Sequence, residues 1–441
     1  MAGEELFAKL AEKVGPQKDP GAVRLREPER GQVSLQVYDL ERLIGADHRA
    51  RVIWSYVEKQ DLSALEQLVR AREHRPGQAP VSPKLLLALW LYATTQGVGS
   101  ARALARLCES ENAYRWLCGG VRVNYHGLSD FRSAQGELLD ELLTKHVASL
   151  SAAGVIDLDE VVQDGVRVRN WAGSGSFRRR KSLHKELRKA RRLVARLRQE
   201  REEDPQATDR RRRAAEERGA RERMEGVERA LGKLKELEGE QKSKRPNKAK
   251  GEKQREPRAS TSDPQARVMK MADGGYRPAY NCQIATVCQG QIVIAAEAKA
   301  TGSDRGLQRS MLEGLQRRYE RLPRRHLIDG GYQKNDDTQW AAERGVLIYG
   351  PAVHSKHGSD PYAPRAKDKP GVAAWRRRMK SPHGKGVYKR RAMGECFHAR
   401  ARQWGLRQFT LRGLDKVNAV LRFFALANNI LTAHRLHLAR S

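Results

Sequence analysis

The sequence predicts an α/β domain that is interrupted by a helical insertion and preceded by an all-helical region. Apolar residues recur at helical spacing over residues 35–150, and β-branched runs alternate with helical patterns after residue 155. A highly charged stretch separates the first β-branched run from the others. We therefore expect three parts: a helical N-terminal domain at 1–150, an α/β domain formed by 151–177 and 258–441, and an inserted basic hairpin with a flexible linker at 178–257.

The N-terminal region is expected to be mostly helical. In SPKLLLALWLYA, Ser82 and Pro83 provide an N-cap and a first-turn residue. Further along, a turn at residues 119–120 and a loop precede another helix, with Ser129 at its cap. This pattern fits a helix-turn-helix that binds DNA, and ordinary helix packing produces the same pattern. Its basic residues are Arg115, Arg122 and Arg132.

The first strand is expected in VIDLDEVVQDGVRVRNWAGSG, with Asp164 on it and an exit turn after Trp171. Asp157 and Asp159 flank the same strand and are alternatives to Asp164 as a functional acid. Asp164 is favoured because two valines precede it and a glycine follows it. Trp171 either packs in the core or stacks on an exposed nucleobase.

Residues 178–258 interrupt the strand pattern with 30 Lys+Arg against 16 Asp+Glu, a local excess of 14. Narrow apolar stripes at helical spacing predict an antiparallel helical hairpin with a proline-bearing turn near DPQATD and a flexible tail. The hairpin is either a solvated charged element or an arm that clamps DNA. The stripes consist of Leu187, Val194 and Leu197, then Val227, Leu231, Leu234 and Leu237.

The strand pattern resumes after the insertion. AYNCQIATVCQGQIVIAAEAKA reads as two strands joined by a turn, and a helix follows around RGLQRSMLEGLQRRYERL. The short strand RRHLI then ends at Asp329, before a helix and the strand VLIYGP. A basic loop over residues 353–387 and a long closing helix complete the chain. This alternation predicts a mixed sheet with flanking helices.

The net charge indicates a polyanionic partner. The chain has 85 Lys+Arg and 53 Asp+Glu, which gives +32, far more than solubility requires. Nucleic acid is favoured over an anionic membrane because no basic amphipathic anchor or membrane span is present. The N-terminus lacks a secretory pattern, so we expect a cytoplasmic protein. The five cysteines contain no Cys-x-x-Cys pair, which argues against disulfides and structural zinc.

Three acids occupy chemically suggestive positions: Asp164 on the first strand, Asp329 at the end of a later strand, and Glu395 on a late helix. Strand ends meet at a shared edge, so these acids are expected to converge. Converging carboxylates repel one another unless cations intervene, and hard oxygen ligands select Mg²⁺ or Mn²⁺. Two such ions support hydrolysis or transfer of a phosphodiester. Asp273 is the rival for the second acid, and Asp336 and Asp337 are expected to cap a helix.

The segment YKRRAMGECFHARARQWGLRQF surrounds Glu395 with cations. Tyr388, Arg391, Glu395 and Arg402 follow one another at offsets of 3, 4 and 7, which would place them on one face of a helix. Glu395 is then either a metal ligand or the ion-pair partner of Arg391 or Arg402.

These residues resemble the DDE transposases of bacterial insertion sequences, in particular the group whose late helix carries Tyr-x2-Arg-x3-Glu-x6-Lys. Tyr388, Arg391 and Glu395 match this signature, and Arg402 replaces the lysine. QDGVRVR resembles the segment of the first acid, LIDGGY that of the second, and GLRQFTLRGLDKV the segment after the third. SPKLLLALWLYA through HGLSDFR is similar to the helical domain that precedes such catalytic cores.

The resemblance implies a ribonuclease-H-like core in which Asp164, Asp329 and Glu395 bind two Mg²⁺ ions, with Mn²⁺ as a substitute. It implies nicking at the ends of the element and attack of the freed 3′-hydroxyl on target DNA. Tyr388 and Arg391 would contact terminal phosphates or a displaced base, and Arg402 the DNA backbone. The implied partners are double-stranded DNA, as terminal inverted repeats and target, and a second copy in a synaptic homodimer near the bacterial nucleoid.

Two rival functions remain at this point. A nuclease of the same fold would cut DNA without strand transfer. A transposase-derived DNA-binding protein would bind DNA without cutting it, although the presence of all three acids disfavours this alternative.

Overall fold

The computed structural model describes residues 39–67, 79–203, 210–244, 256–352 and 360–438. From residue 43 onward, the described residues form one compact unit. The predicted turn at 204–209, most of the predicted linker and the start of the first predicted helical stretch lie outside the described residues. Among the described residues, no helix is long and apolar enough to cross a membrane.

The region before the sheet is helical, as predicted. After the short 3-10 helix η1 (Leu40–Leu43), its helices are α2 (Arg49–Glu58), α3 (Ser63–Gln67), α4 (Pro83–Thr95), α5 (Ala101–Ser110), α6 (Asn112–Cys118), α7 (Tyr125–Ala134) and α8 (Gly136–Ala152). Helix α4 is buried all round from Leu85 onward, as a helix that is apolar on every face must be.

Two details of the helical region correct the sequence analysis. Ser129 lies inside α7 and does not cap it; the cap is Asn124, whose Oδ1 accepts a hydrogen bond from the Gly127 amide at 2.8 Å. Arg132 is buried, at 7% exposure, so it does not belong to a basic DNA-facing surface. The predicted turn at residues 119–120 is confirmed, because both glycines have positive φ angles.

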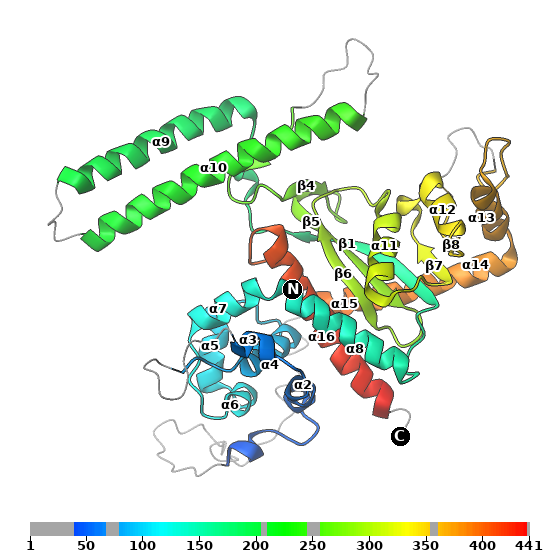
Figure 1. Ribbon diagram of the computed structural model, residues 1–441, viewed down its shortest axis with the longest axis horizontal. Coiled ribbons are helices and arrows are strands. Elements are labelled where there is room, and N and C mark those ends of the chain that lie inside the picture. Colours follow the sequence, from blue (N-terminus) through cyan, green and yellow to red (C-terminus); the bar gives the residue numbers. More distant parts are fainter. Residues whose placement is uncertain (1–38, 68–78, 204–209, 245–255, 353–359, 439–441) are drawn as a thin grey trace, which may run out of the picture. The chain divides into compact units, whose positions relative to one another are not determined.

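A mixed sheet follows, with β1 (Glu160–Arg169) at its centre (Figure 1). Strand β1 runs antiparallel to β5 (Tyr276–Val287) and parallel to β7 (Arg325–Ile328), which in turn pairs with β8 (Leu347–Tyr349) in parallel. Strand β6 (Val293–Lys299) pairs with β5. The predicted α/β class with a mixed sheet is confirmed.

Several short strands were not predicted. Strand β4 (Arg267–Lys270) pairs with the start of β5. After the 3-10 turn η2 (Ser174–Ser176), β2 (Phe177–Arg178) pairs with β3 (Ala259–Ser260). The β2–β3 pair joins the two ends of the insertion. Such strands are too short to show an alternation of apolar and polar residues, so they form because of the strands that they pair with.

The insertion forms two long helices side by side, α9 (Arg180–Glu203) and α10 (Arg210–Lys244) (Figure 1). Leu183, Leu187, Val227 and Leu234 form a small core between them. The predicted antiparallel hairpin is therefore confirmed.

The rest of the chain alternates helices with β7 and β8: α11 (Leu307–Tyr319), the 3-10 turn η3 (Gly330–Tyr332) and α12 (Asn335–Ala342). The predicted basic loop is wrong over much of its length, because α13 (Pro370–Lys380) and α14 (Pro382–Lys389) form there. Each begins with a proline in its first turn, and α13 buries Val372, Trp375 and Met379 at helical spacing. Residues 353–359 of that loop lie outside the described part of the chain.

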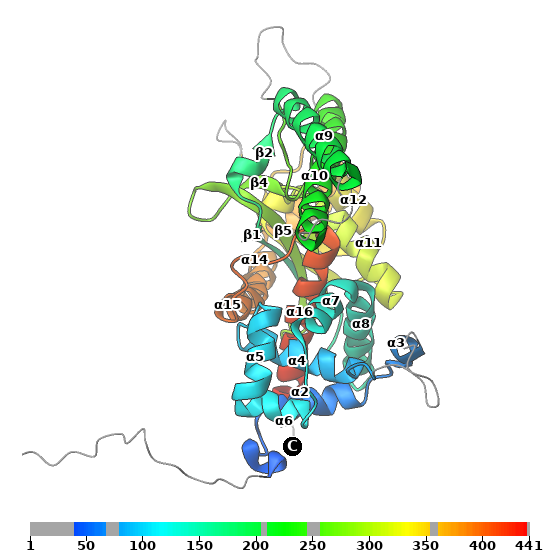
Figure 2. The ribbon, with the colours of Figure 1, turned by 90° about the vertical axis from the view of Figure 1, so that its left-hand side faces the viewer.

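The last helix, α16 (Leu414–Leu438), contacts α2, α4, α7 and α8 as well as β6 (Figure 2). The helical region and the sheet therefore share one apolar core, to which Trp90 and Phe423 belong. Asn429 fastens α16 to the sheet: its side chain accepts a hydrogen bond from the Val293 amide and donates one to the Val293 carbonyl. Near residue 150 the chain changes from helix to strand within this shared core. That residue 150 is a domain boundary remains a prediction.

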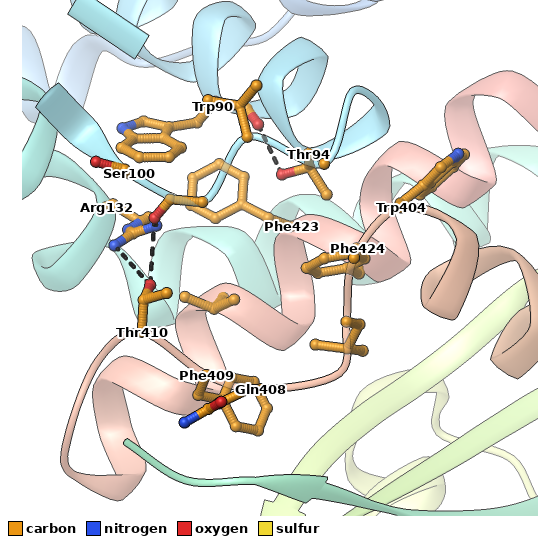
Figure 3. A pocket seen from close by; sticks show the side chains of 16 residues that line it. Trp90, Thr94, Ser100, Arg132, Trp404, Gln408, Phe409, Thr410, Phe423 and Phe424 are labelled. Atoms are coloured by element: carbon orange, nitrogen blue, oxygen red, sulfur yellow. Dashed lines mark hydrogen bonds between the residues drawn. The ribbon is translucent and has the colours of Figure 1, made fainter. Parts of the chain in front are cut away.

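A cavity of about 290 Å³ lies in this core (Figure 3). Its walls are mainly apolar and include five aromatic side chains, and Arg132 lies at its polar end (Figure 3). Arg132 donates a hydrogen bond to the Gly99 carbonyl at 2.6 Å and one to Thr410 Oγ1 at 3.4 Å. Burial lowers the pKa of Arg132 to about 10. Arg132 therefore links α7 to the loop before α16, which contains Thr410.

Candidate active site

Strand register places two of the predicted acids beside each other. In the parallel pair β1–β7, Gln163 lies opposite Ile328, so the next residues along the two strands are Asp164 and Asp329. Residues level with each other on neighbouring strands face the same side of a sheet. Asp329 follows the end of β7, where its carboxylate accepts a hydrogen bond from the Gly330 amide at 2.6 Å.

The third acid reaches the same face through a close backbone approach. Glu395 is the first residue of α15 (Glu395–Gln403), directly after the 3-10 segment η4 (Arg390–Gly394). A Cβ atom on Gly394 would lie 2.6 Å from Val162 Cγ1 and 3.9 Å from Asp164 Cβ. Arg390 also pairs with Glu160 at the start of β1, at 2.6 Å. Segment η4 is thus held against β1 near both ends.

Arg391 lies among the acids. Its guanidinium is 3.6 Å from Asp164 Oδ2 and 2.9 Å from Glu395 Oε1. Burial would lower the pKa of Arg391, but the charges of Tyr388 and of the three acids outweigh burial and raise it. The ion pair between Arg391 and Glu395, one of the two alternatives from the sequence, is therefore present, and it lies beside Asp164.

Asp164 has an unusual electrostatic environment. Burial raises its pKa, the nearby charges of Asp329 and Glu395 raise it further, and the Gly165 amide and Arg391 act in the opposite direction. The net direction is upward. A carboxylate that is costly to ionise in the protein alone is one that an added cation would stabilise.

The signature residues do not lie on one uninterrupted α-helix. Tyr388 is in α14, Arg391 in η4, and Glu395 and Arg402 in α15. The predicted single helical face is wrong because the tighter 3-10 segment rotates the residues before it relative to those after it. Arg402 is exposed, and burial raises the pKa of Tyr388.

His398, which was not predicted from the sequence, also lies beside the acids. It is 8% exposed, and its Nε2 lies 3.6 Å from Asp164 Oδ2. Within the described residues neither ring nitrogen has a hydrogen-bond partner. Burial, together with the charges of Arg402 and Arg391, lowers its pKa to about 4, so the ring is neutral at pH 7. The signal available was its position three residues after Glu395, on the same helical face.

A buried polar network behind β1 was also missed. Alternate residues of a strand face opposite sides, so Gly165 faces away from the side of Asp164. A Cβ on Gly165 would lie 2.6 Å from Gln283 Nε2 and 2.8 Å from Tyr332 Oη. Tyr332 donates to Gln283 Oε1 at 2.7 Å, and Gln283 donates to Asp304 at 3.0 Å. This network supports the strand that carries Asp164.

The alternative acids lie in other surroundings. Asp159 pairs with Arg321 at 2.5 Å, and exposed Asp273 pairs with Arg277 at 2.6 Å. Asp336 and Asp337 lie in the first turn of α12, but the residue at the N-cap position is Lys334, so their predicted capping role is wrong. Trp171 is 52% exposed, which excludes the core alternative.

A cleft of about 520 Å³ adjoins the second acid. Gly330 and Gly331, which follow Asp329, line it together with Arg305, Lys334 and Arg365. Arg376 is a fourth cation on its wall and Asp336 is an acid there, so the lining is mainly cationic, which suits a phosphodiester.

No group of three or more His, Cys, Asp or Glu side chains is arranged to hold a metal ion within the described residues. Asp164 and Glu395 each lie against the guanidinium of Arg391, and they do not converge on a common position where one ion could bind. The donor types fit a hard divalent cation, since all three predicted ligands are carboxylates.

Two protein-family profiles match the chain. A transposase domain (DUF772) matches residues 38–134, and a transposase DDE domain matches residues 240–430. The first covers α2 to α7, and the second contains Asp329 and Glu395, whereas Asp164 lies outside both. No curated protein and no solved structure matches the chain.

The helical region and the α/β region thus each match a part of transposases, which defines an enzyme of the transposase type. Together, the two matches indicate a DDE transposase of the insertion-sequence type.

Proposed function

We propose that this transposase cleaves DNA at the ends of an insertion sequence and joins the freed 3′-hydroxyl to target DNA. The observation that carries the proposal is the gathering of Asp164 and Glu395 around Arg391, with Asp329 next to Asp164 in strand register. We assign these three acids as the catalytic residues. We also assign the chain to the group with the Tyr-Arg-Glu-Lys helix and the core to the ribonuclease-H-like folds.

Asp164, Asp329 and Glu395 would hold Mg²⁺, with Mn²⁺ as a substitute. When bound, such ions supply Lewis-acid activation of the attacking oxygen and stabilise the leaving oxygen of the phosphodiester. The upward shift in the pKa of Asp164 supports this assignment, because the protein alone does not fully compensate that charge. Arg391 keeps the carboxylates partly neutralised and limits their mutual repulsion.

Cations around the acids would orient the DNA. Arg391 and Tyr388 lie beside the acids and would contact a terminal phosphate or a displaced base, and exposed Arg402 would contact the backbone. The cleft beside Asp329, with Arg305 and Lys334 on its wall, would receive the phosphates next to the scissile bond.

The remaining parts of the proposal concern partners. Helices α2 to α8 would bind the terminal inverted repeats, and exposed Trp171 would stack on a base. Two copies would hold the two ends in a synaptic homodimer. The protein would act in the bacterial cytoplasm, at the nucleoid.

The first prediction tests the acids. Asp164→Asn, Asp329→Asn and Glu395→Gln should each lower Mg²⁺-dependent cleavage of end DNA by at least about a hundredfold, because each removes charge from the site of reaction. DNA binding should remain. The measurement is gel-resolved nicking of a labelled duplex that carries an element end, with binding measured on the same duplex.

Asp273→Asn is the matched control, since Asp273 is an exposed acid paired with Arg277, and it should cleave like the wild type. Full cleavage by any of the three variants would remove that residue from the assignment. Cleavage without joining to an added target duplex would identify a nuclease instead. DNA binding without any cleavage by the wild type would identify an inactive DNA-binding derivative.

A further inference from the structure

One face of α9 carries a continuous row of cations: Lys181, Lys185, Arg188 and Arg192. Their spacings of 4, 3 and 4 residues place them within an arc of about 60° on a helix. All four are exposed. Leu183 and Leu187 point the other way, into the small core against α10. We call these four residues the α9 stripe.

Other cations of the hairpin have acidic partners. Arg180 pairs with Glu238 at 2.5 Å, Arg191 with Glu228 at 2.9 Å and Arg198 with Glu202 at 3.0 Å. In the part of the chain that the structure describes, no residue of the α9 stripe has such an ion pair. The acids of the hairpin therefore pair with other cations, and the face that carries the α9 stripe remains positively charged.

Two features of the α9 stripe are unfavourable for an isolated helix. Like charges four residues apart, such as Lys181 with Lys185 and Arg188 with Arg192, repel each other. In addition, the first turn of α9 contains no acid, and Lys181 lies near the positive end of the helix dipole. A polyanion along this face would relieve both.

We propose that the α9 stripe binds the phosphate backbone of duplex DNA. From Lys181 to Arg192 the helix rises about 16 Å, which corresponds to roughly five phosphates along one strand of a duplex. Contacts of this kind carry no sequence information, so the stripe holds DNA rather than selecting a sequence. The inference rests on the proposed function, in which DNA is the substrate, and adds a surface outside the site of the three acids.

The experiment compares two triple variants of the full chain. Lys185→Gln, Arg188→Gln and Arg192→Gln remove three charges from the stripe. Arg191→Gln, Arg198→Gln and Arg229→Gln remove three charges that have acidic partners in the hairpin. Both variants have the same net charge, and glutamine is a good helix former, so circular dichroism should show the wild-type helix content in both.

Fluorescence anisotropy with a labelled duplex is then recorded over a salt series. For the stripe variant, the slope of log affinity against log salt should fall by about 2.7, and affinity should fall about a hundredfold at about 0.15 M salt. The control variant should keep the wild-type slope. Equal changes in both variants would show a bulk charge effect and overturn the proposal, as would an unchanged slope in the stripe variant.

Two duplexes separate the sources of DNA. A loss confined to a duplex with an element end assigns the stripe to the donor DNA, and an equal loss with unrelated duplex assigns it to any DNA, including the target. A loss seen with single strands and not with duplex would overturn the proposal. Asp164→Asn should retain the wild-type salt slope, so a failure of the proposed chemistry and a failure of the stripe give different results.

Discussion

At the scale of single residues, the candidate site depends on a charge balance around Arg391. Its guanidinium contacts Asp164 and Glu395, while burial and the neighbouring acids keep the pKa of Asp164 raised. Asp164 is therefore costly to ionise in the protein alone, as we expect for the cation site that we propose. Sites organised for function commonly cost stability in this way.

A second prediction follows from the raised pKa of Asp164. Ionisation of Asp164 opposes folding. It lowers the free energy of unfolding above the pKa of Asp164 in the folded protein, and this loss is absent below its pKa in the unfolded chain, about 3.9. Asp164→Asn should therefore raise the free energy of unfolding by roughly 0.5–2 kcal/mol near pH 7. The difference from the wild type should vanish as pH falls through about 4.

Denaturant titrations in the presence of a chelator, from pH 4 to pH 8, measure this difference. A variant that is less stable than the wild type at pH 7 would show that the contact with Arg391 outweighs burial.

At the scale of elements, the site depends on how η4 lies against β1. Gly394 allows the backbone to approach Val162, a buried β-branched residue with little freedom to move. Arg390 holds the other end of η4 to Glu160. This packing sets where α15 begins, and hence where Glu395 lies relative to Asp164.

The third prediction concerns this contact. Gly394→Ala places a Cβ 2.6 Å from Val162 Cγ1, so η4 must shift. The change should destabilise the protein by about 1–3 kcal/mol, as overpacking does, and should reduce cleavage of end DNA.

Gly386→Ala is the matched control. Gly386 lies inside α14, and among the described residues no atom outside its own stretch of helix lies within 4 Å of the position that a Cβ would take there. Alanine at this position should stabilise the helix by about 0.5–1 kcal/mol. Thermal unfolding and nicking assays on both variants test the contact. Wild-type cleavage by Gly394→Ala would show that the position of η4 does not matter for the reaction.

At the scale of the whole molecule, α16 joins the helical region to the sheet. It packs on α4 and α8 on the helical side and on β6 of the sheet, and Asn429 satisfies both backbone groups of Val293. Because the two regions share a core, they are expected to unfold together.

The fourth prediction tests this coupling. Asn429→Leu leaves a buried amide and a buried carbonyl of Val293 without partners, which should cost about 2–5 kcal/mol. Lys416→Ala, on an exposed position of the same helix, should change stability by less than about 0.5 kcal/mol. Calorimetry should show one transition in both. Two separate transitions in the wild type would contradict a shared core.

Much of this protein was determined by local sequence pattern. The helical region, the antiparallel hairpin and the strands β1, β5, β6, β7 and β8 follow from apolar periodicity, which records which face of an element is buried. The positions of Asp164 and Asp329 on or directly after buried strands were visible in the same way, and the two family profiles bear out the resemblance to DDE transposases.

Tertiary structure determined the remaining elements and contacts, because apolar periodicity shows that one face of an element is buried but not which element packs against that face. Helices α13 and α14 were not predicted because their apolar faces are narrow and many of their residues are cations. Strand β4 and the β2–β3 pair form because of the strands that they pair with. His398 beside Asp164 and the network behind Gly165 join residues far apart in the chain. Arg391 among the acids depends on η4 meeting β1, a contact between elements more than two hundred residues apart, which no local pattern contains.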